Sequence, residues 1–100
     1  MIGEVIRVKE VSSGGRKYLG LEVNLPGSPP LVLLVGETGF AMCGFLDVSA
    51  AEKKGAVAVK IPGVSSVEEL LEKEIAEATS RAEAKGLRKG VRLKDVLDYL

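Results

Sequence analysis

Hydrophobic and polar positions alternate through the first quarter of the chain. Residues 2–11 are rich in Val and Ile, and a Ser-Ser-Gly-Gly turn at 12–15 separates them from residues 18–25. In the second segment, leucine or valine occupies positions 19, 21, 23 and 25, with polar, aromatic or small residues between them. Strict alternation places one set on each side of a strand. The pattern therefore predicts a half-buried antiparallel β-hairpin.

A continuous apolar segment follows. Residues 31–35 are apolar at every position, as expected for a central strand covered on both faces. The turn at 36–39 leads to a predicted fourth strand at 40–43, and residues 57–61 form the fifth. A short helix between these last two strands makes a crossover connection, so they should be parallel. The proline-rich segment 26–30 separates the hairpin from this core, since proline cannot donate a ladder hydrogen bond.

Helical spacing of apolar residues predicts three helices, near Ser49–Lys54, Ser66–Lys85 and Arg92–Leu100. Ser49 and Glu52 form a capping-box pattern, and Gly55 follows as a stop signal. The predicted fold class is α+β: a five-strand mixed sheet, including the N-terminal antiparallel hairpin, with these helices packed on one face. Residues 1–100 are expected to form one domain, divided into a hairpin region at 1–25 and an α/β core at 31–100.

The absence of histidine removes several kinds of chemistry. With no His and a single Cys, neither the chain nor a symmetric oligomer of it can build a Ser-His-Asp or Cys-His catalytic site or a typical zinc site. We expect no metal and no cofactor. One cysteine also excludes an intrachain disulfide and favours a cytoplasmic location. Scarce amide side chains beside abundant Glu, Lys and Val are typical of a thermophilic source.

Charge and hydropathy argue against two kinds of partner. The formal net charge is zero, which argues against a nucleic-acid binder, because such proteins carry excess positive charge. The basic residues between 81 and 94 follow an acidic stretch, an order that complements a helix dipole. The longest apolar run, residues 31–35, is far shorter than the ~20 residues that cross a bilayer. We therefore expect no membrane association.

The candidate site lies in the segment that holds the only cysteine. Cys43 is at a predicted strand end between Gly39 and Gly44, and a helix start follows it. Unpaired N–H groups at a helix start can lower a thiol pKa. The alternative for Cys43 is a small buried hydrophobic residue. Asp47 is likewise either an acidic partner of the thiol or the N-cap of the next helix.

Alternation along the strand predicts where the thiol points. If Phe40 and Met42 face the helix-covered core, Cys43 faces the opposite side of the sheet. We expect it at a cleft bordered by the 36–39 turn and the start of the following helix. The candidate ligand-binding residues are therefore Thr38, Gly39, Cys43, Gly44 and Asp47. A second loop, residues 63–66, leads from a strand into a helix and is either simple capping or an anion site.

The same segment resembles a known family. Met42-Cys43-Gly44 followed by Leu46-Asp47-Val48 is similar to the signature of the YunC-like proteins (domain of unknown function 1805), small bacterial and archaeal proteins without an established reaction. The resemblance extends from about Leu25 to the C-terminus. It implies a tetramer assembled through the β-rich N-terminal region, and it names no substrate.

Two functions from different classes remain open. The first is a small oligomeric binding or regulatory module with a small-molecule site near Cys43. The second is a thiol-dependent enzyme that uses Cys43 with Asp47 or a lysine. In either case we expect a homo-oligomer formed through residues 1–25, because a two-stranded ribbon is hardly stable alone and its apolar face needs cover.

Overall fold

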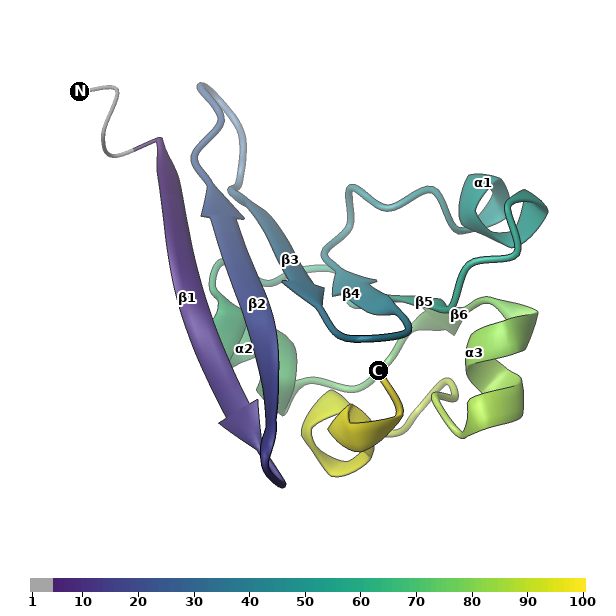
Figure 1. Ribbon diagram of the computed structural model, residues 1–100. Coiled ribbons are helices and arrows are strands. Elements are labelled where there is room, and N and C mark those ends of the chain that lie inside the picture. Colours follow the sequence, from purple (N-terminus) through teal and green to yellow (C-terminus); the bar gives the residue numbers. More distant parts are fainter. Residues whose placement is uncertain (1–4) are drawn as a thin grey trace.

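The computed structural model describes residues 5–100, which are organised around a six-stranded mixed sheet (Figure 1). Its strands lie side by side in chain order. Their bounds are β1 Ile6–Ser13, β2 Arg16–Val23, β3 Leu31–Val35, β4 Phe40–Met42, β5 Ala58–Lys60 and β6 Glu77–Ala78. Neighbouring strands are antiparallel except β4 and β5, which are parallel as predicted. Positions 2–4 of the predicted first strand lie outside the described residues.

The helices are short. They are α1 Val48–Lys53, α2 Val67–Glu72, α3 Ser80–Lys85 and the 3-10 helix η2 Leu93–Tyr99. The prediction for α1 is confirmed within a residue, and Gly55 follows it with a positive φ of 71°, a conformation that glycine adopts without strain. The terminal helix is present but is 3-10, and non-helical backbone at Val96 interrupts it.

The predicted long helix at Ser66–Lys85 is wrong. The chain turns extended at Lys73, which has φ −92° and ψ 162°, and the following residues run along the outer edge of β5. There the Ala76 N–H donates to the Lys60 carbonyl at 2.9 Å, and the Thr79 N–H to the Ala58 carbonyl at 3.0 Å. This pairing forms β6 and satisfies the edge of β5, which an unbroken helix would leave unpaired. It also accounts for the sixth strand, which the sequence pattern did not predict.

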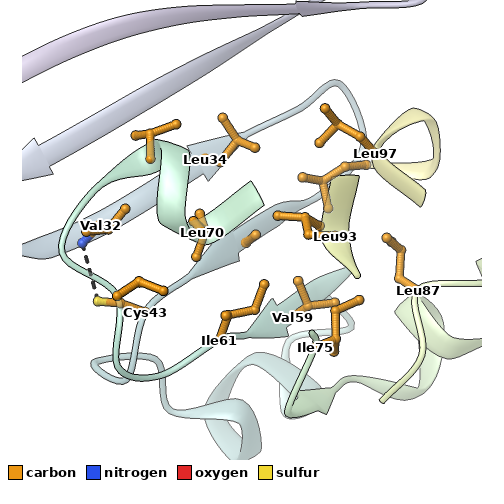
Figure 2. Packing of buried hydrophobic residues seen from close by; sticks show 14 of the residues in the cluster. Val32, Leu34, Cys43, Val59, Ile61, Leu70, Ile75, Leu87, Leu93 and Leu97 are labelled. Atoms are coloured by element: carbon orange, nitrogen blue, oxygen red, sulfur yellow. Dashed lines mark hydrogen bonds between the residues drawn. The ribbon is translucent and has the colours of Figure 1, made fainter. Parts of the chain in front are cut away.

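The main core lies between one face of the sheet and the later helices (Figure 2). Val32 and Leu34 of β3, Ala41 of β4 and Val59 of β5 are fully buried on this face. Large residues from α2, η2 and the connecting segments pack on them, including Leu70, Ile75, Leu87, Leu93 and Leu97. The small side chain of Ala41 leaves room for these larger residues to approach the sheet.

Helix α1 packs on the opposite face, so the prediction that all helices cover one face is wrong. Leu46, Ala51 of α1 and Ala58 of β5 form a separate buried cluster, against which Phe40 and Met42 pack. Because β4 and β5 are joined by a crossover that passes over this face, α1 must cover the side chains that alternate with Ala41 and Val59.

Within residues 5–100, no helix packs on the rest of that second face, which is largely apolar. Ile6, Val8, Leu19 and Val35 are exposed hydrophobic residues of β1–β3, and cross-strand pairs place Leu21 and Leu33 between them. Val35 in turn pairs with Phe40, so this surface continues to the cluster under α1. We call it the open face. In Figure 1, α2 lies behind β1 and β2, and none of the helices within residues 5–100 lies in front of β1–β3.

Candidate functional site

Cys43 follows β4 directly and points into the main core. Only 3% of the residue is exposed. Its sulfur accepts a hydrogen bond from the Val32 N–H at 3.3 Å, and its own N–H donates to the Val32 carbonyl at 3.0 Å (Figure 2). The alternation that we predicted is present, but the faces are reversed. Ala41 and Cys43 face the main core, and Phe40 and Met42 face α1, because Ala41 pairs with the buried Leu34.

A cavity of about 380 Å³ opens beside Cys43. It lies where three loops meet at one end of the sheet: the connector before β3, the loop after β4 and the loop after β5. Its lining is Pro29 and Pro30, residues 43–45 and residues 63–65. Gly44 therefore joins Cys43 in the cavity wall. Phe45 borders the opening with half of its surface exposed.

Thr38 and Gly39 are not part of this cavity, because they precede β4 while Cys43 follows it. The expected border between Cys43 and the 36–39 turn is therefore wrong. Both backbone N–H groups donate to the Leu100 carbonyl, at 2.9 and 2.8 Å, and the Thr38 hydroxyl donates to it at 2.9 Å. Lys85 Nζ donates to the Thr38 hydroxyl. At Gly39, an added Cβ would lie 2.5 Å from the Val57 carbonyl oxygen, so this glycine makes room for the neighbouring strand.

Asp47 is the N-cap of α1, one of the two roles that the sequence left open. Its carboxylate accepts a hydrogen bond from the Ala50 N–H at 3.2 Å. Asp47 lines a different cavity, of about 480 Å³, beneath α1 together with Phe40 and Met42. Cys43 does not line that cavity, so the structure does not bring the two side chains into one cavity. Phe45 lines both cavities.

The loop at 63–66 caps α2. Ser66 Oγ accepts from the Glu69 N–H at 3.1 Å, and the Glu69 carboxylate accepts from the Ser65 N–H at 3.1 Å. The Val67 N–H donates to buried Glu22 of β2 at 2.8 Å. Protein groups thus occupy the N–H groups at 65, 67 and 69. This arrangement fits the capping alternative for the loop.

Sequence reasoning missed the residues that other segments bring to the site. The sequence pattern predicts Glu22 only as a polar position of an alternating strand, and Pro29 and Pro30 only as part of a connector. Burial alone would raise the pKa of Glu22, but hydrogen bonds from Lys9 and the Val67 N–H, with the nearby Lys9 and Arg7 charges, hold it below 4.5. Glu22 is the single acidic residue among the β2 positions that face α2, and this was a sequence signal for a paired carboxylate. Its partners could not be identified from the sequence, because they are not close to Glu22 in the chain.

Residues 5–100 contain no group of three or more Cys, Asp and Glu side chains placed to hold a metal ion. Over the same residues, no helix has the length and apolar character needed to cross a membrane.

Comparison with known proteins gives two similar chains. The uncharacterized protein YunC of Bacillus subtilis (strain 168) is 26% identical over 97 residues, which cover 93% of this chain and 95% of that protein. The crystal structure of TA1206, a protein of unknown function from Thermoplasma acidophilum, matches with a TM-score of 0.91 and 32% identity. That match covers 95% of this chain and 92% of the other.

A family described as "Domain of unknown function (DUF1805)" matches residues 42–100, which is more than half of the chain. The match begins at the Met42-Cys43-Gly44 motif and includes the loops after β4 and β5 that line the Cys43 cavity. The α+β fold, the YunC relative and this match agree, and the chain belongs to the YunC-like family of DUF1805 proteins.

Proposed function

We propose that this chain is a cytoplasmic, homo-oligomeric binding or regulatory module, with a small-molecule site in the cavity beside Cys43. The cavity is the observation that carries the proposal. Its volume of about 380 Å³ is within the range of small-molecule pockets, and apolar side chains line it beside a few polar backbone groups. It also lies where loops converge at one end of a sheet, a frequent place for ligands in α/β structures.

The open face supports the oligomeric part. Ile6, Val8 and Leu19 expose 54%, 64% and 51% of their surfaces on adjacent strands. An apolar surface of this extent on a sheet is normally covered by a partner. A second copy would cover it with the same face, since a two-fold interface uses one patch twice. Residues 1–25 would then form most of the interface, and β3 would extend it.

The alternative of a thiol-dependent enzyme finds less support in the geometry. Cys43 is buried, and its sulfur already accepts the Val32 N–H. Asp47 caps α1 and lines the other cavity, and no lysine is among the described residues that line the Cys43 cavity. A nucleophilic cysteine needs a base or a positive charge beside it and access for substrate.

Mass spectrometry of the purified protein tests the binding proposal. We expect the native protein to retain a small molecule that denaturation releases. Ser65→Trp should abolish this retention, because Ser65 is an exposed residue of the cavity wall and a bulky ring there would fill the space. Ser49→Trp, on the exposed side of α1, is the matched control. The proposal would be contradicted if Ser65→Trp still retained the small molecule. It would also be contradicted if the native protein carried no more of the small molecule than Ser65→Trp does.

A further inference from the structure

We infer that the Cys43 cavity is selective for an uncharged, ring-bearing small molecule. This inference rests on the proposed function and names the chemical class of its ligand. It follows from the charges, the shape and the hydrogen bonds at the cavity wall.

Among residues 5–100, those that line the cavity carry no charged side chain. Its side chains are those of Pro29, Pro30, Phe45 and Val64, with the thiol of Cys43 and the hydroxyl of Ser65 as polar groups. A ligand that bore a full charge would lose hydration on entry, and none of the side chains that line the cavity would offer it an opposite charge, so this loss is expensive. An uncharged ligand avoids that loss.

The loop at 63–66 precedes α2, where free backbone N–H groups would normally favour an anion. Here carboxylates of the protein already accept hydrogen bonds from these groups. Glu69 accepts the Ser65 N–H, and Glu22 accepts the Val67 N–H. The ammonium group of Lys73 contacts this loop, and its Nζ donates a hydrogen bond to the Gly63 carbonyl at 3.0 Å. A phosphate or carboxylate would therefore meet carboxylates at the positions where it needs free N–H groups.

The shape of the wall favours a ring. Phe45 presents an exposed aromatic side chain at the opening, and the two proline rings form an apolar surface in the same cavity. Aromatic and proline surfaces pack well against flat ligands. Gly44 and Gly63 have no side chain, so their backbone groups can approach the polar edge of such a ligand.

Benzamide and benzoate test this inference, because they have the same shape and differ in charge. Each would be titrated into ¹⁵N-labelled full-length protein while backbone amide shifts are recorded. We expect saturable shifts from benzamide at residues 43–45 and 63–65, and at least tenfold weaker binding of benzoate. Phe45→Ala should weaken benzamide binding about tenfold. Val35→Ala, on the exposed face of β3 and outside the cavity, should leave it unchanged.

The outcomes separate this inference from the proposed function. If benzoate binds at residues 43–45 and 63–65 as tightly as benzamide or more tightly, the ligand class is wrong while the site stands. If both probes shift only residues elsewhere, or benzamide gives no saturable shift at the cavity, the ligand class is overturned. In that case the mass-spectrometry comparison of native protein with Ser65→Trp decides separately whether the site itself is wrong.

Discussion

Single residues connect the hairpin to the helical layer, and Glu22 is the clearest case. Its side chain is 5% exposed, accepts from Lys9 Nζ at 2.8 Å and from the Val67 N–H at 2.8 Å, and lies 3.8 Å from Arg7. A buried carboxylate is stable only when it is paired in this way. Glu22 therefore fixes the start of α2 against β2.

Replacing Glu22 should make stability less dependent on pH. At pH 7, Glu22→Gln should lower the free energy of unfolding by about 1–3 kcal/mol, because it loses a charge-assisted hydrogen bond. The folded pKa of Glu22 lies below its ordinary value of 4.5, so its contribution is present above pH 4.5 and is lost as the pH falls through the folded pKa. Urea unfolding at pH 7 and pH 3 should therefore show a smaller difference between variant and wild type at pH 3.

The matched control is Glu10→Gln on β1, which is exposed and pairs only with Lys17 at 3.2 Å among the described residues. It should change stability by less than about 0.5 kcal/mol at either pH. An equal effect of the two variants would show that Glu22 has no special role.

Removing the Tyr18 hydroxyl should stabilise the protein, whereas replacing Glu22 should destabilise it. It is 3% exposed, and within residues 5–100 its hydroxyl has no hydrogen-bond partner. Burial first, and then the charge of Asp98, raises its pKa, so the phenol stays neutral. Removing an unpaired buried hydroxyl relieves its desolvation cost. Tyr18→Phe should therefore raise the free energy of unfolding by about 1 kcal/mol.

Urea unfolding of Tyr18→Phe measures this gain, and Tyr99→Phe is the control because Tyr99 is half exposed. The control should lie within about 0.5 kcal/mol of wild type. A loss of stability in Tyr18→Phe would mean that the hydroxyl has a partner in solution.

Some residue roles could be predicted from the sequence because the interacting groups are close together in the chain, and others could not. The capping role of Asp47 was one of its two predicted roles, because its partner Ala50 is three residues away. Glu22 could not be read in this way, since its partner Val67 is 45 residues along the chain. The buried environment of Cys43 depended on strand register, and alternation alone fixed which residues share a face without fixing which face is inside.

At the scale of elements, five of the six strands were predictable, whereas β6 and the break in the predicted long helix were not. Residues 31–35 are apolar throughout and form β3 with the predicted bounds. In residues 66–85, the apolar spacing fits one helix, and only Thr79 and Ser80 break it with residues that favour caps. Pairing with β5 is a long-range interaction, which no local pattern encodes, and it outweighs helix propensity there.

Thr79 should therefore be the residue on which this junction depends. It is 1% exposed, donates to the Ala56 carbonyl at 2.7 Å, accepts from the Ala58 N–H at 3.1 Å and caps α3. Thr79→Val keeps the shape but removes the hydroxyl, and should lower the free energy of unfolding by about 2 kcal/mol. Thr79→Ser keeps the hydroxyl and should cost about 0.8 kcal/mol, the value of one buried methyl group. Thermal or urea unfolding of both variants checks the order, and a reversed order would contradict this role.

At the scale of the whole molecule, the sheet has one face in the core and one that is only partly covered. The sequence predicted a mixed α+β sheet and an alternating hairpin. It could not predict that α1 would cover only the β4–β5 end, because the position of a crossover helix depends on strand order. Nor could it bring Pro29, Phe45 and Val64 together beside Cys43, since they come from three separate loops.

The open face leads to the final prediction, on self-association. Leu21 is half-buried on β2 and pairs with Val8 on one side and Leu33 on the other, so it lies at the centre of this face. A charge at the centre of an apolar interface must be desolvated without a partner, which costs several kcal/mol. In light scattering at micromolar concentration, the wild type should be an oligomer, and Leu21→Lys should shift it to the monomer.

The control for this experiment is Ala84→Lys on the exposed surface of α3, which adds the same charge away from the open face. It should leave the mass unchanged, and circular dichroism should show that both variants are folded. A monomeric wild type, or a Leu21→Lys oligomer of wild-type mass, would contradict assembly through the open face. Phe40 continues the open face and lines the α1 cavity together with Phe45. Light scattering of Phe45→Ala therefore tests whether the interface reaches the proposed ligand site. A reduced mass for Phe45→Ala would place the interface next to the proposed ligand site.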